Sequence, residues 1–315
     1  VGRSGNLKLR KAQLDDVLEG GAPWAVAAGY GEYADIEHCE ENGCMSWARA
    51  GAVSKRAKQR GRDQLGTLGA GNHFVELGEV TEVYDEEAAE VFGLRPGQLV
   101  VQLLSGSRGL GHQVCTDYVR AFQTVVQREK YRLPDRELVC APLASQEGED
   151  YLAAMSAAAN YAWANRQVMT DVLRRALESA LLGKVRNVNL YLVYDVAHNV
   201  AKIEQHQVGG KTLEVCVHRK GATRAFPPGQ GAVPSAYRDV GQPVLVPGDM
   251  GTASYVLRGT AKAMAETFGS CCHGAGRVLS RSAARRQVNA QELHRLLEKR
   301  GIVVRARSMR GLAEE

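Results

Sequence analysis

The stretch at residues 267–286 reads TFGSCCHGAGRVLSRSAARR, and the rest of the chain is best interpreted from it. His273 stands between a pair of cysteines and a Gly-Ala-Gly turn. Arg277, Arg281 and Arg285 follow at four-residue spacing, which predicts a helix with three arginines on one face. Glycines leave the backbone bare beside the imidazole, and a helix start there would offer free N–H groups to an anion. The stretch therefore suggests a histidine that faces a phosphate.

A second interpretation of this stretch has to be kept open. A histidine next to glycines is often only a turn residue, and arginines at this spacing are often a solvated helix face. Phosphate-binding Gly-rich turns are common, but so are sequences that merely resemble them. The rest of the chain has to decide between the two.

Size and composition are those of an ordinary soluble globular protein. The chain has 315 residues, of which 44% are hydrophobic and 24% charged, enough for one large or two ordinary domains. No apolar run approaches the length of a membrane span, and the N-terminal sequence has no signal-peptide core. We therefore expect a cytoplasmic protein without a membrane partner. The seven cysteines form no CxxC pair and are expected to be reduced thiols.

Charge permits a polyanionic partner without requiring one. The chain has 40 Lys and Arg against 35 Asp and Glu, a net charge of +5. Basic residues gather at residues 55–62, 219–224 and 305–310. Each cluster alone is typical of a solvated face, but several of them flank Gly-rich turns, which favours a surface that contacts phosphate.

Apolar runs along the chain repeatedly meet turns that carry Gly together with His, Asn, Ser or Arg. The expected strands cover residues 74–83, 97–104, 188–196, 213–217, 243–246 and 302–305. The expected helices cover about residues 8–29, 85–94, 114–130, 149–182 and 290–299, with another around Met264. Loop tips on a fixed scaffold are where sites are built. With no repeat or linker, we expect one domain, residues 1–315, with one site.

Three histidines lie at expected strand-to-loop junctions: His73 after Asn72, His198 before Asn199, and His273. Imidazole binds several transition metals, and a metal beside a nucleotide polarises phosphoryl oxygens. His73 and His198 could equally be core histidines, because no HxxxH or HxH pair marks them as ligands. The missing P-loop, GxGxxG and GxSxG frames argue against a P-loop enzyme, a Rossmann dehydrogenase and a serine hydrolase.

Eight blocks, in order, resemble the signature blocks of the RtcB family of RNA-splicing ligases. They read GAGNHFVE, SGSRGLGHQ, NYAWANRQ, DVAHNVAKIE, HRKGATRAFPPG, PGDMGTASYVL, FGSCCHGAGRVLSRSAA and VRARSMRGLAEE. The resemblance covers nearly the whole chain. It implies an α+β fold in which mixed sheets and surrounding helices enclose one central site.

The resemblance also implies an activity. Members are GTP- and manganese-dependent ligases that join RNA ending in a 3′-phosphate or 2′,3′-cyclic phosphate to RNA with a 5′-hydroxyl, in tRNA splicing and RNA repair. His273 matches the nucleophile, which attacks the α-phosphate of GTP and carries GMP as a phosphoramidate. The GMP then passes to the RNA 3′-phosphate, and the 5′-hydroxyl displaces it. The implied partners are RNA, such as tRNA halves, and an archease-like activator, with no requirement for DNA.

The site residues that the resemblance implies fall into three sets. His73 and His198 match manganese ligands. The positions that match GTP contacts are Asn72, His73, Phe74, Val75, Glu76, His198, Asn199, Pro247, Gly248, Asp249, Met250, Ser254, His273, Gly274, Ala275 and Gly276. The basic residues of the Gly-rich turns, expected to contact RNA or phosphate, are Arg108, Arg219, Lys220, Arg224 and Arg277.

Some positions depart from the family pattern. Leu104 stands where the family has a histidine that binds the second manganese, and Asp249 stands where serine is common. The Asp249 carboxylate could accept from guanine N–H groups or could repel a phosphate. The family's Asp and Cys ligands and its C-terminal lysine find no match here, so we expect the central part of a ligase with weaker manganese affinity. The alternative is a catalytically impaired relative or fragment that binds GTP or RNA without turnover.

Overall fold

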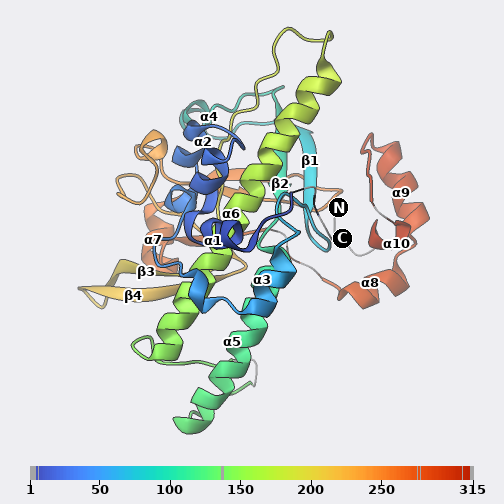
Figure 1. Cartoon of the computed structure of the whole chain (residues 1–315). Helices are drawn as coiled ribbons and strands as arrows, with labels where there is room; N and C mark the ends of the chain where they lie inside the picture. The colour runs from blue at the N-terminus through green and yellow to red at the C-terminus, as the bar shows by residue number, and fades with distance from the viewer. Residues whose placement is uncertain are drawn as a thin grey trace. The chain divides into compact units, whose positions relative to one another are not determined.

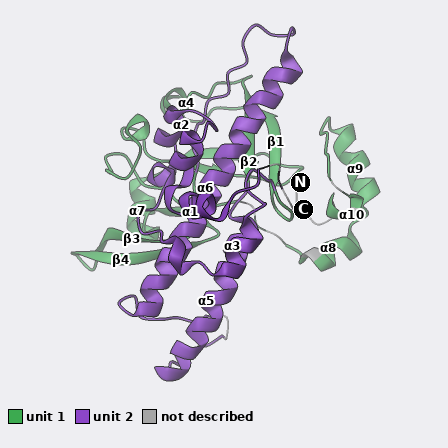
Figure 2. Cartoon of the chain, viewed as in Figure 1, with its two compact units in different colours: residues 1, 69–104, 196–315 green, residues 2–68, 105–195 purple. Residues whose placement is uncertain are grey.

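The computed structural model describes residues 5, 7–135, 138–274, 276, 278–306 and 308–312. The chain divides into two compact units, each assembled from separate pieces of the sequence (Figure 2). Unit 1 contains residues 1, 69–104 and 196–315, and unit 2 contains residues 2–68 and 105–195. The single domain expected from the sequence stays a prediction.

Unit 2 is helical, and its longest helix is α6 (Figure 1). Its elements are α1 (Lys11–Ala27), α2 (Tyr33–Glu37), the 3-10 turns η1 (Glu40–Gly43) and η2 (Ala50–Ala52), α3 (Lys55–Gly61), α5 (Arg108–Arg128) and α6 (Gln146–Leu181). Leu14 and Leu18 of α1 pack in one core with Ala157 and Tyr161 of α6. The small side chains of α6 let α1 approach closely, because little volume separates the two backbones.

Unit 1 combines short helices with antiparallel strand pairs. Its helical elements are α4 (Glu86–Phe92), η3 (Ser235–Tyr237), α7 (Ala261–Thr267), α8 (Arg281–Gln287), α9 (Ala290–Lys299) and α10 (Met309–Leu312). Its strands are β1 (Phe74–Glu79), β2 (Leu99–Leu104), β3 (Asn199–Val208), β4 (Lys211–Lys220), β5 (Ala222–Arg224), β6 (Pro243–Val246), β7 (Tyr255–Arg258) and β8 (Ser270–Cys272). The described strands pair as β1–β2, β3–β4, β5–β8 and β6–β7. The predicted α+β class is confirmed.

Two of these pairs position the site. In the β3–β4 hairpin, Val208 pairs with Lys211 across a Gly-Gly turn, the turn chemistry typical of a tight hairpin. At the other end of the hairpin, Asn199 pairs with Lys220. Next along the chain, β5 pairs with β8 so that Ala222 lies opposite Cys272. This register brings the β4–β5 junction next to the segment that leads into His273.

Most of the expected elements are present, including β1, β2, β6, α5 and α6, and α9 has the bounds expected from the sequence. The strand expected at residues 188–196 is wrong, since only Asp195 makes an isolated bridge, to Cys39. A side chain forms a hydrogen bond that a neighbouring strand would otherwise make with this segment: Arg174 Nε donates to Leu190 O at 2.8 Å. The strand β3, which begins at Asn199, was missed.

The strand expected at residues 302–305 is also wrong. The backbone N–H of Ile302 donates to Leu297 O at 2.9 Å, which closes the end of α9 instead of joining a sheet. Gly301 has a φ of 77°, the left-handed conformation that ends helices in this way. Among the described residues, no helix is long and apolar enough to cross a membrane.

Candidate active site around His273

His273 follows β8 directly, and its imidazole is held by two neighbours from the β3–β5 region. The ring stacks on that of His198, with 4.6 Å between centroids and 3° between planes. On Gly221, a Cβ atom would lie 3.3 Å from Cδ2 and 3.4 Å from Nε2 of His273. The ring therefore rests against backbone where a side chain would fit only if the ring moved by a few tenths of an ångström.

Gly221 joins β4 to β5 and organises the second histidine as well. Its φ of 66° is in the left-handed region that glycine adopts readily. Its N–H donates to His198 O at 2.9 Å, and it lies 3.1 Å from the accepting Oδ1 of Asn199. Segments around residues 198, 221 and 273, far apart in the sequence, thus meet at one place.

The electrostatic surroundings favour the neutral form of His273. Burial lowers the pKa of its imidazole, and the positive charge of the exposed Lys220 lowers it further. A neutral imidazole has a free lone pair and can act as a nucleophile near pH 7. Nδ1 is buried and has no hydrogen-bond partner among the described residues. The nitrogen left to meet a ligand is therefore Nε2.

The loop at residues 247–254 connects β6 to β7 and lies against the segment after His273. A Cβ atom on Gly274 would be 3.2 Å from Pro247 O, so close contact there requires glycine or a shift of the loop. Gly248 N donates to Ser254 Oγ at 3.1 Å, which closes the loop. The predicted positions Pro247 and Gly274 thus lie together next to His273, and Ser254 closes the loop that begins at Pro247.

Asp249 has a local role in this loop. Its Oδ1 accepts from Gly251 N at 2.8 Å, and its own N–H donates to Thr252 Oγ1 at 3.0 Å. This is a side-chain-closed turn of the kind that Asp and Ser both form. Arg300, which follows α9, donates from Nη2 to Gly251 O at 2.8 Å and holds the same turn from outside. One oxygen of the Asp249 carboxylate therefore already accepts a hydrogen bond from the backbone. Met250, the next residue, is half-buried.

The other predicted nucleotide positions lie at β1. Asn72 and His73 form the turn before the strand, where His73 N donates to Gly71 O at 2.7 Å. Phe74, Val75 and Glu76 are the first three residues of β1. Phe74 pairs with Leu104, the last residue of β2. The leucine that departs from the family pattern therefore lies directly opposite the start of the predicted nucleotide segment.

The predicted manganese site was tested against these side chains. In the part of the chain that the structure describes, no three His, Cys, Asp or Glu side chains gather in a way that could hold a metal ion. Leu104 offers hydrocarbon where an imidazole would supply a ligand, and transition metals need such donors. His73 and His198 alone do not make up a manganese site. The described residues therefore do not hold the ion by themselves.

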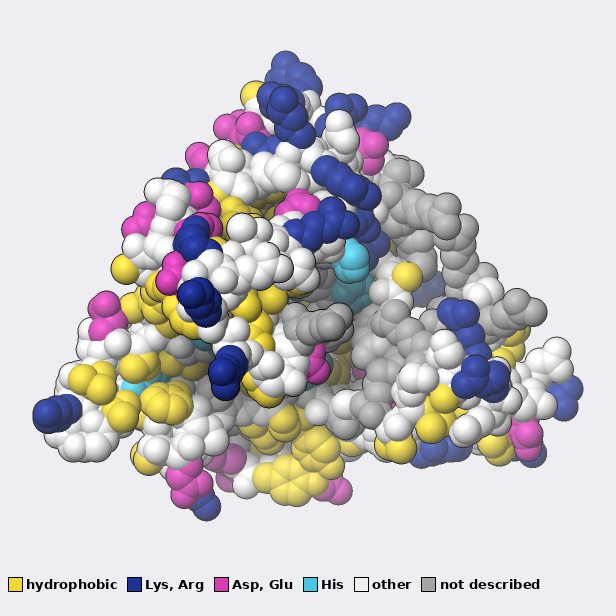
Figure 3. All heavy atoms as spheres, turned by 90° about the horizontal axis from the view of Figure 1, so that it is seen from below, with side chains coloured by type: hydrophobic (Ala, Val, Ile, Leu, Met, Phe, Trp, Pro, Cys, Tyr) yellow, Lys and Arg dark blue, Asp and Glu magenta, His cyan; other side chains and the backbone are white. Residues whose placement is uncertain are grey.

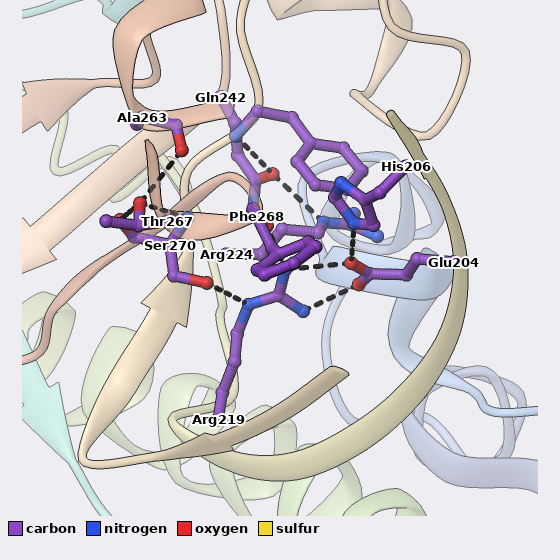
Figure 4. Close-up of polar contacts among 10 residues, drawn as sticks. Glu204, His206, Arg219, Arg224, Gln242, Ala263, Thr267, Phe268 and Ser270 are labelled. Carbon is purple, nitrogen blue, oxygen red and sulfur yellow. Dashed lines mark hydrogen bonds and ion pairs between the residues drawn. The ribbon is translucent and has the colours of Figure 1, made fainter. Parts of the chain in front are cut away.

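The predicted phosphate contacts have different surroundings. Lys220 is exposed, close enough to His273 for its charge to lower the pKa of the imidazole. Arg219 and Arg224 are buried and bonded to protein groups, to Glu204 and Gln242 among others (Figure 4). Their contact with RNA stays a prediction, and it would require these internal bonds to be exchanged.

The remaining basic positions are placed as follows. Arg108 is the first residue of α5 in unit 2, has a φ of 55° and donates from Nε to Thr67 Oγ1 at 3.2 Å. Burial lowers the pKa of its guanidinium. Arg277 and Ala275 lie outside the described residues, and Gly276 is exposed with a φ of 72°. On the face drawn in Figure 3, several Lys and Arg side chains gather in the upper part of the view, and others are scattered among acidic and hydrophobic ones.

The helix start expected beside His273 is corrected by the structure. Helix α8 begins at Arg281, and Ser280 caps it by accepting from Ala283 N at 3.2 Å. Gly274 and Gly276 precede this helix and are not part of it. The serine cap was visible in the sequence as SRSAARR, a pattern typical of a helix N-terminus. Any anion at His273 is therefore met by loop backbone and Lys220 rather than by a helix N-terminus.

Comparisons with known proteins identify the family of the chain. The family model described as tRNA-splicing ligase RtcB matches residues 1–315. The tRNA-splicing ligase RtcB of Pyrococcus abyssi is 56% identical over all of this chain, which covers 34% of that protein. Those of Thermococcus kodakarensis and Archaeoglobus fulgidus are 56% and 53% identical, again over the whole chain, which covers 65% of each. The chain thus spans less than two thirds of the length of these relatives.

Proposed function

Because the chain belongs to the RtcB family of tRNA-splicing ligases, we propose that it provides the catalytic body of an RNA ligase acting through His273. The substrates would be RNA with a 3′-phosphate or 2′,3′-cyclic phosphate end and RNA with a 5′-hydroxyl end, such as tRNA halves. GTP would supply the energy. The observation that carries the proposal is the imidazole of His273, stacked on His198 and seated against Gly221, with its pKa lowered by burial and Lys220.

In the first step, Nε2 of His273 attacks the α-phosphorus of GTP. An N–P bond forms, the P–O bond to the β-phosphate breaks, and pyrophosphate leaves with the electron pair. The neutral ring needs no base to free this lone pair, because burial and Lys220 both disfavour its protonated form. The stacked His198 and the backbone at Gly221 fix the direction of attack, and such positioning is a large part of catalysis of phosphoryl transfer.

In the second and third steps, the GMP moves to RNA and is displaced. An oxygen of the RNA 3′-phosphate attacks the same phosphorus, the N–P bond breaks, and the electron pair returns to Nε2. The 5′-hydroxyl then attacks the phosphorus of the RNA 3′-phosphate and loses its proton to solvent, while the P–O bond to GMP breaks and GMP leaves with the electron pair, so that the new phosphodiester forms. Lys220 is exposed and positively charged, so it can stabilise the negative charge that develops on the phosphoryl oxygens.

The nucleotide contacts stay part of the proposal. They comprise the turn and first residues of β1, the 247–254 loop and the Gly-Ala-Gly segment after His273. His73 and His198 are proposed as two ligands of a manganese ion whose other ligands the described residues do not supply. An archease-like activator is proposed as the protein partner, on the family resemblance alone.

A second function is favoured by one specific observation. Leu104 lies opposite Phe74 and supplies no metal ligand at the place where the family pattern has one. A chain that binds GTP or RNA without turnover would follow if the metal is required and cannot be held. This is the catalytically impaired alternative.

A ligation assay with defined ends separates the two functions. The chain is incubated with GTP, manganese and two RNA fragments, one with a labelled 3′-phosphate and one with a 5′-hydroxyl. The proposed ligase gives a joined product with the label in the junction, and His273→Ala gives none. RNA retained only at low salt, without joining, supports the second function, since phosphate contacts alone are salt-sensitive.

A further inference from the structure

A buried ionic cluster occupies one face of the β3–β4 hairpin (Figure 4). Arg219 donates from Nη1 and Nη2 to the two carboxylate oxygens of Glu204, at 2.6 and 2.9 Å. His206 Nε2 lies 2.9 Å from Glu204 Oε2. The side chains of Arg219, His206 and Glu204 are 1%, 2% and 7% exposed. The cluster is out of reach of solvent and of any nucleotide on the surface.

Arg219 also reaches the segment that carries His273. Its Nε donates to Ser270 Oγ and its Nη2 to Phe268 O, both at 2.9 Å. Ser270 is the first residue of β8, and His273 follows directly after that strand. Phe268 has a φ of 53°, which is unfavourable for an aromatic residue and has to be held by its surroundings. The guanidinium therefore fixes the chain just before the nucleophile at two points.

The same strand carries the groups that face His273. Side chains of successive strand residues point to opposite faces of a sheet, so Arg219 and Lys220 project from opposite faces of β4. Lys220 pairs with Asn199 and precedes Gly221, which contacts the ring of His273. The strand β4 is thus anchored to β8 through Arg219 on its buried face, and it ends at Lys220, directly before the glycine that contacts the imidazole.

A gain in net stability does not explain why the buried face carries the ion pair of Arg219 and Glu204. Replacing a buried ion pair by apolar side chains of similar volume is often neutral or stabilising. A planar guanidinium differs from an apolar side chain because its donors have fixed directions, so it can specify the relative position of three groups. Here those groups are Glu204 on β3, Ser270 on β8 and the carbonyl of Phe268.

We propose that Arg219 is a positioning residue, which locks β8 to the β3–β4 hairpin through Ser270 and so holds His273 in line for attack. This role rests on the proposed function of His273 as the nucleophile. It also differs from the contact with RNA phosphate expected for Arg219 from the sequence. The side chain acts through the scaffold and touches no substrate.

Ser270 offers the mildest test. Ser270→Ala removes the hydroxyl to which Arg219 donates, and Ser270→Thr keeps that hydroxyl. Arg219→Lys keeps the positive charge but loses the several donors of the planar guanidinium. Arg258→Lys is the control: Arg258 of β7 also pairs with carboxylates, but these are those of Asp85 and Glu87 at the start of α4 rather than groups bonded to β8. Circular dichroism and urea unfolding establish that each variant is folded.

Two readouts are measured on the folded variants. The first is the rate of GMP adduct formation at saturating GTP with manganese. Ser270→Ala and Arg219→Lys should slow it about tenfold with little change in the KM for GTP, because a displacement well under 1 Å costs rate rather than binding. Ser270→Thr should restore the rate, and Arg258→Lys should leave it unchanged.

The second readout is independent of GTP. The rate at which diethyl pyrocarbonate modifies His273, mapped by mass spectrometry, should rise in Ser270→Ala and Arg219→Lys, since a loosened ring is more accessible. His206 should keep its low rate in Ser270→Ala, which excludes general loosening. If His273 keeps its reactivity in both variants, or Arg258→Lys changes it equally, the positioning role is wrong. If the unchanged chain forms no adduct, the proposed function fails, while the second readout still decides the role of Arg219.

Discussion

Replacing Gly221 with alanine tests how His273 is held. The perturbation has two parts that can be separated. Alanine must adopt a φ of 66°, which costs an L-residue about 1–2 kcal/mol. Its Cβ would also stand 3.3 Å from Cδ2 and 3.4 Å from Nε2 of His273, closer than comfortable van der Waals contact. The ring therefore has to move by a few tenths of an ångström.

The backbone cost should appear as lost stability, and the displacement of the ring should appear as a lower reaction rate. The backbone term should lower the free energy of unfolding by about 1–2 kcal/mol. The displacement acts on the attacking nitrogen itself, where a shift of 1 Å can cost about a hundredfold in rate, so we expect adduct formation to slow by about ten- to thirtyfold. Urea unfolding measures the first, and the initial rate of labelled GMP incorporation from GTP measures the second.

Gly210→Ala is the matched control. Gly210 lies in the β3–β4 turn with a φ of 79°, and no atom lies within 4 Å of an added Cβ. It should lose a similar free energy of unfolding and keep its rate. If Gly221→Ala also keeps its rate at the same loss of stability, the ring of His273 does not rest on Gly221 and the described geometry is wrong.

Three further predictions concern other parts of the chain. Burial would raise the pKa of Asp35, but its hydrogen bonds with Arg174, Glu32 and Gln167 lower the pKa below the usual value of 3.8. The stability that this carboxylate contributes is present above that value and is lost as the pH falls through the lowered pKa. Urea unfolding should therefore show a smaller loss of stability at acid pH for Asp35→Asn than for the unchanged chain. The same loss of stability at acid pH in both proteins would contradict the pairing of Asp35 with Arg174. Asp249→Ser keeps an acceptor for Gly251 N and should change the free energy of unfolding by less than about 0.5 kcal/mol, whereas a larger loss in urea would mean that the carboxylate holds more than its turn. Leu104→His adds an imidazole opposite Phe74 and should tighten manganese binding by about tenfold in calorimetry, and equal affinity would show that residue 104 does not face the metal.

The sequence predicted the elements whose stability comes from local pattern. The long helix α6 and the amphipathic α9 follow from helical periodicity, and β1, β2 and β6 follow from apolar runs that end in turns. The strand β3 was missed because its buried face carries Lys202, Glu204 and His206, so the alternation that marks a strand has polar residues inside. Residues 188–196 alternate correctly but are held by side chains, which the pattern cannot reveal.

The site was predicted in the same uneven way. The family blocks located His273, His198 and the 247–254 loop, and the structure brings them together. Gly221 was missed because its importance depends on a contact with a residue far along the chain. Arg219 was expected at the surface because its partner Glu204 lies fifteen positions earlier, and only the β3–β4 register brings the two charges together.

The central claim is that His273 carries GMP, and mapping the adduct tests it most directly. The chain is incubated with GTP and manganese, and the modified residue is identified by mass spectrometry of peptides. One GMP is expected on His273, stable to alkali and lost in acid, as a phosphoramidate is. It should be absent from His273→Ala and present in His218→Ala, which removes an exposed histidine of β4. An adduct on any other residue, or one that persists undiminished in His273→Ala, would contradict the account.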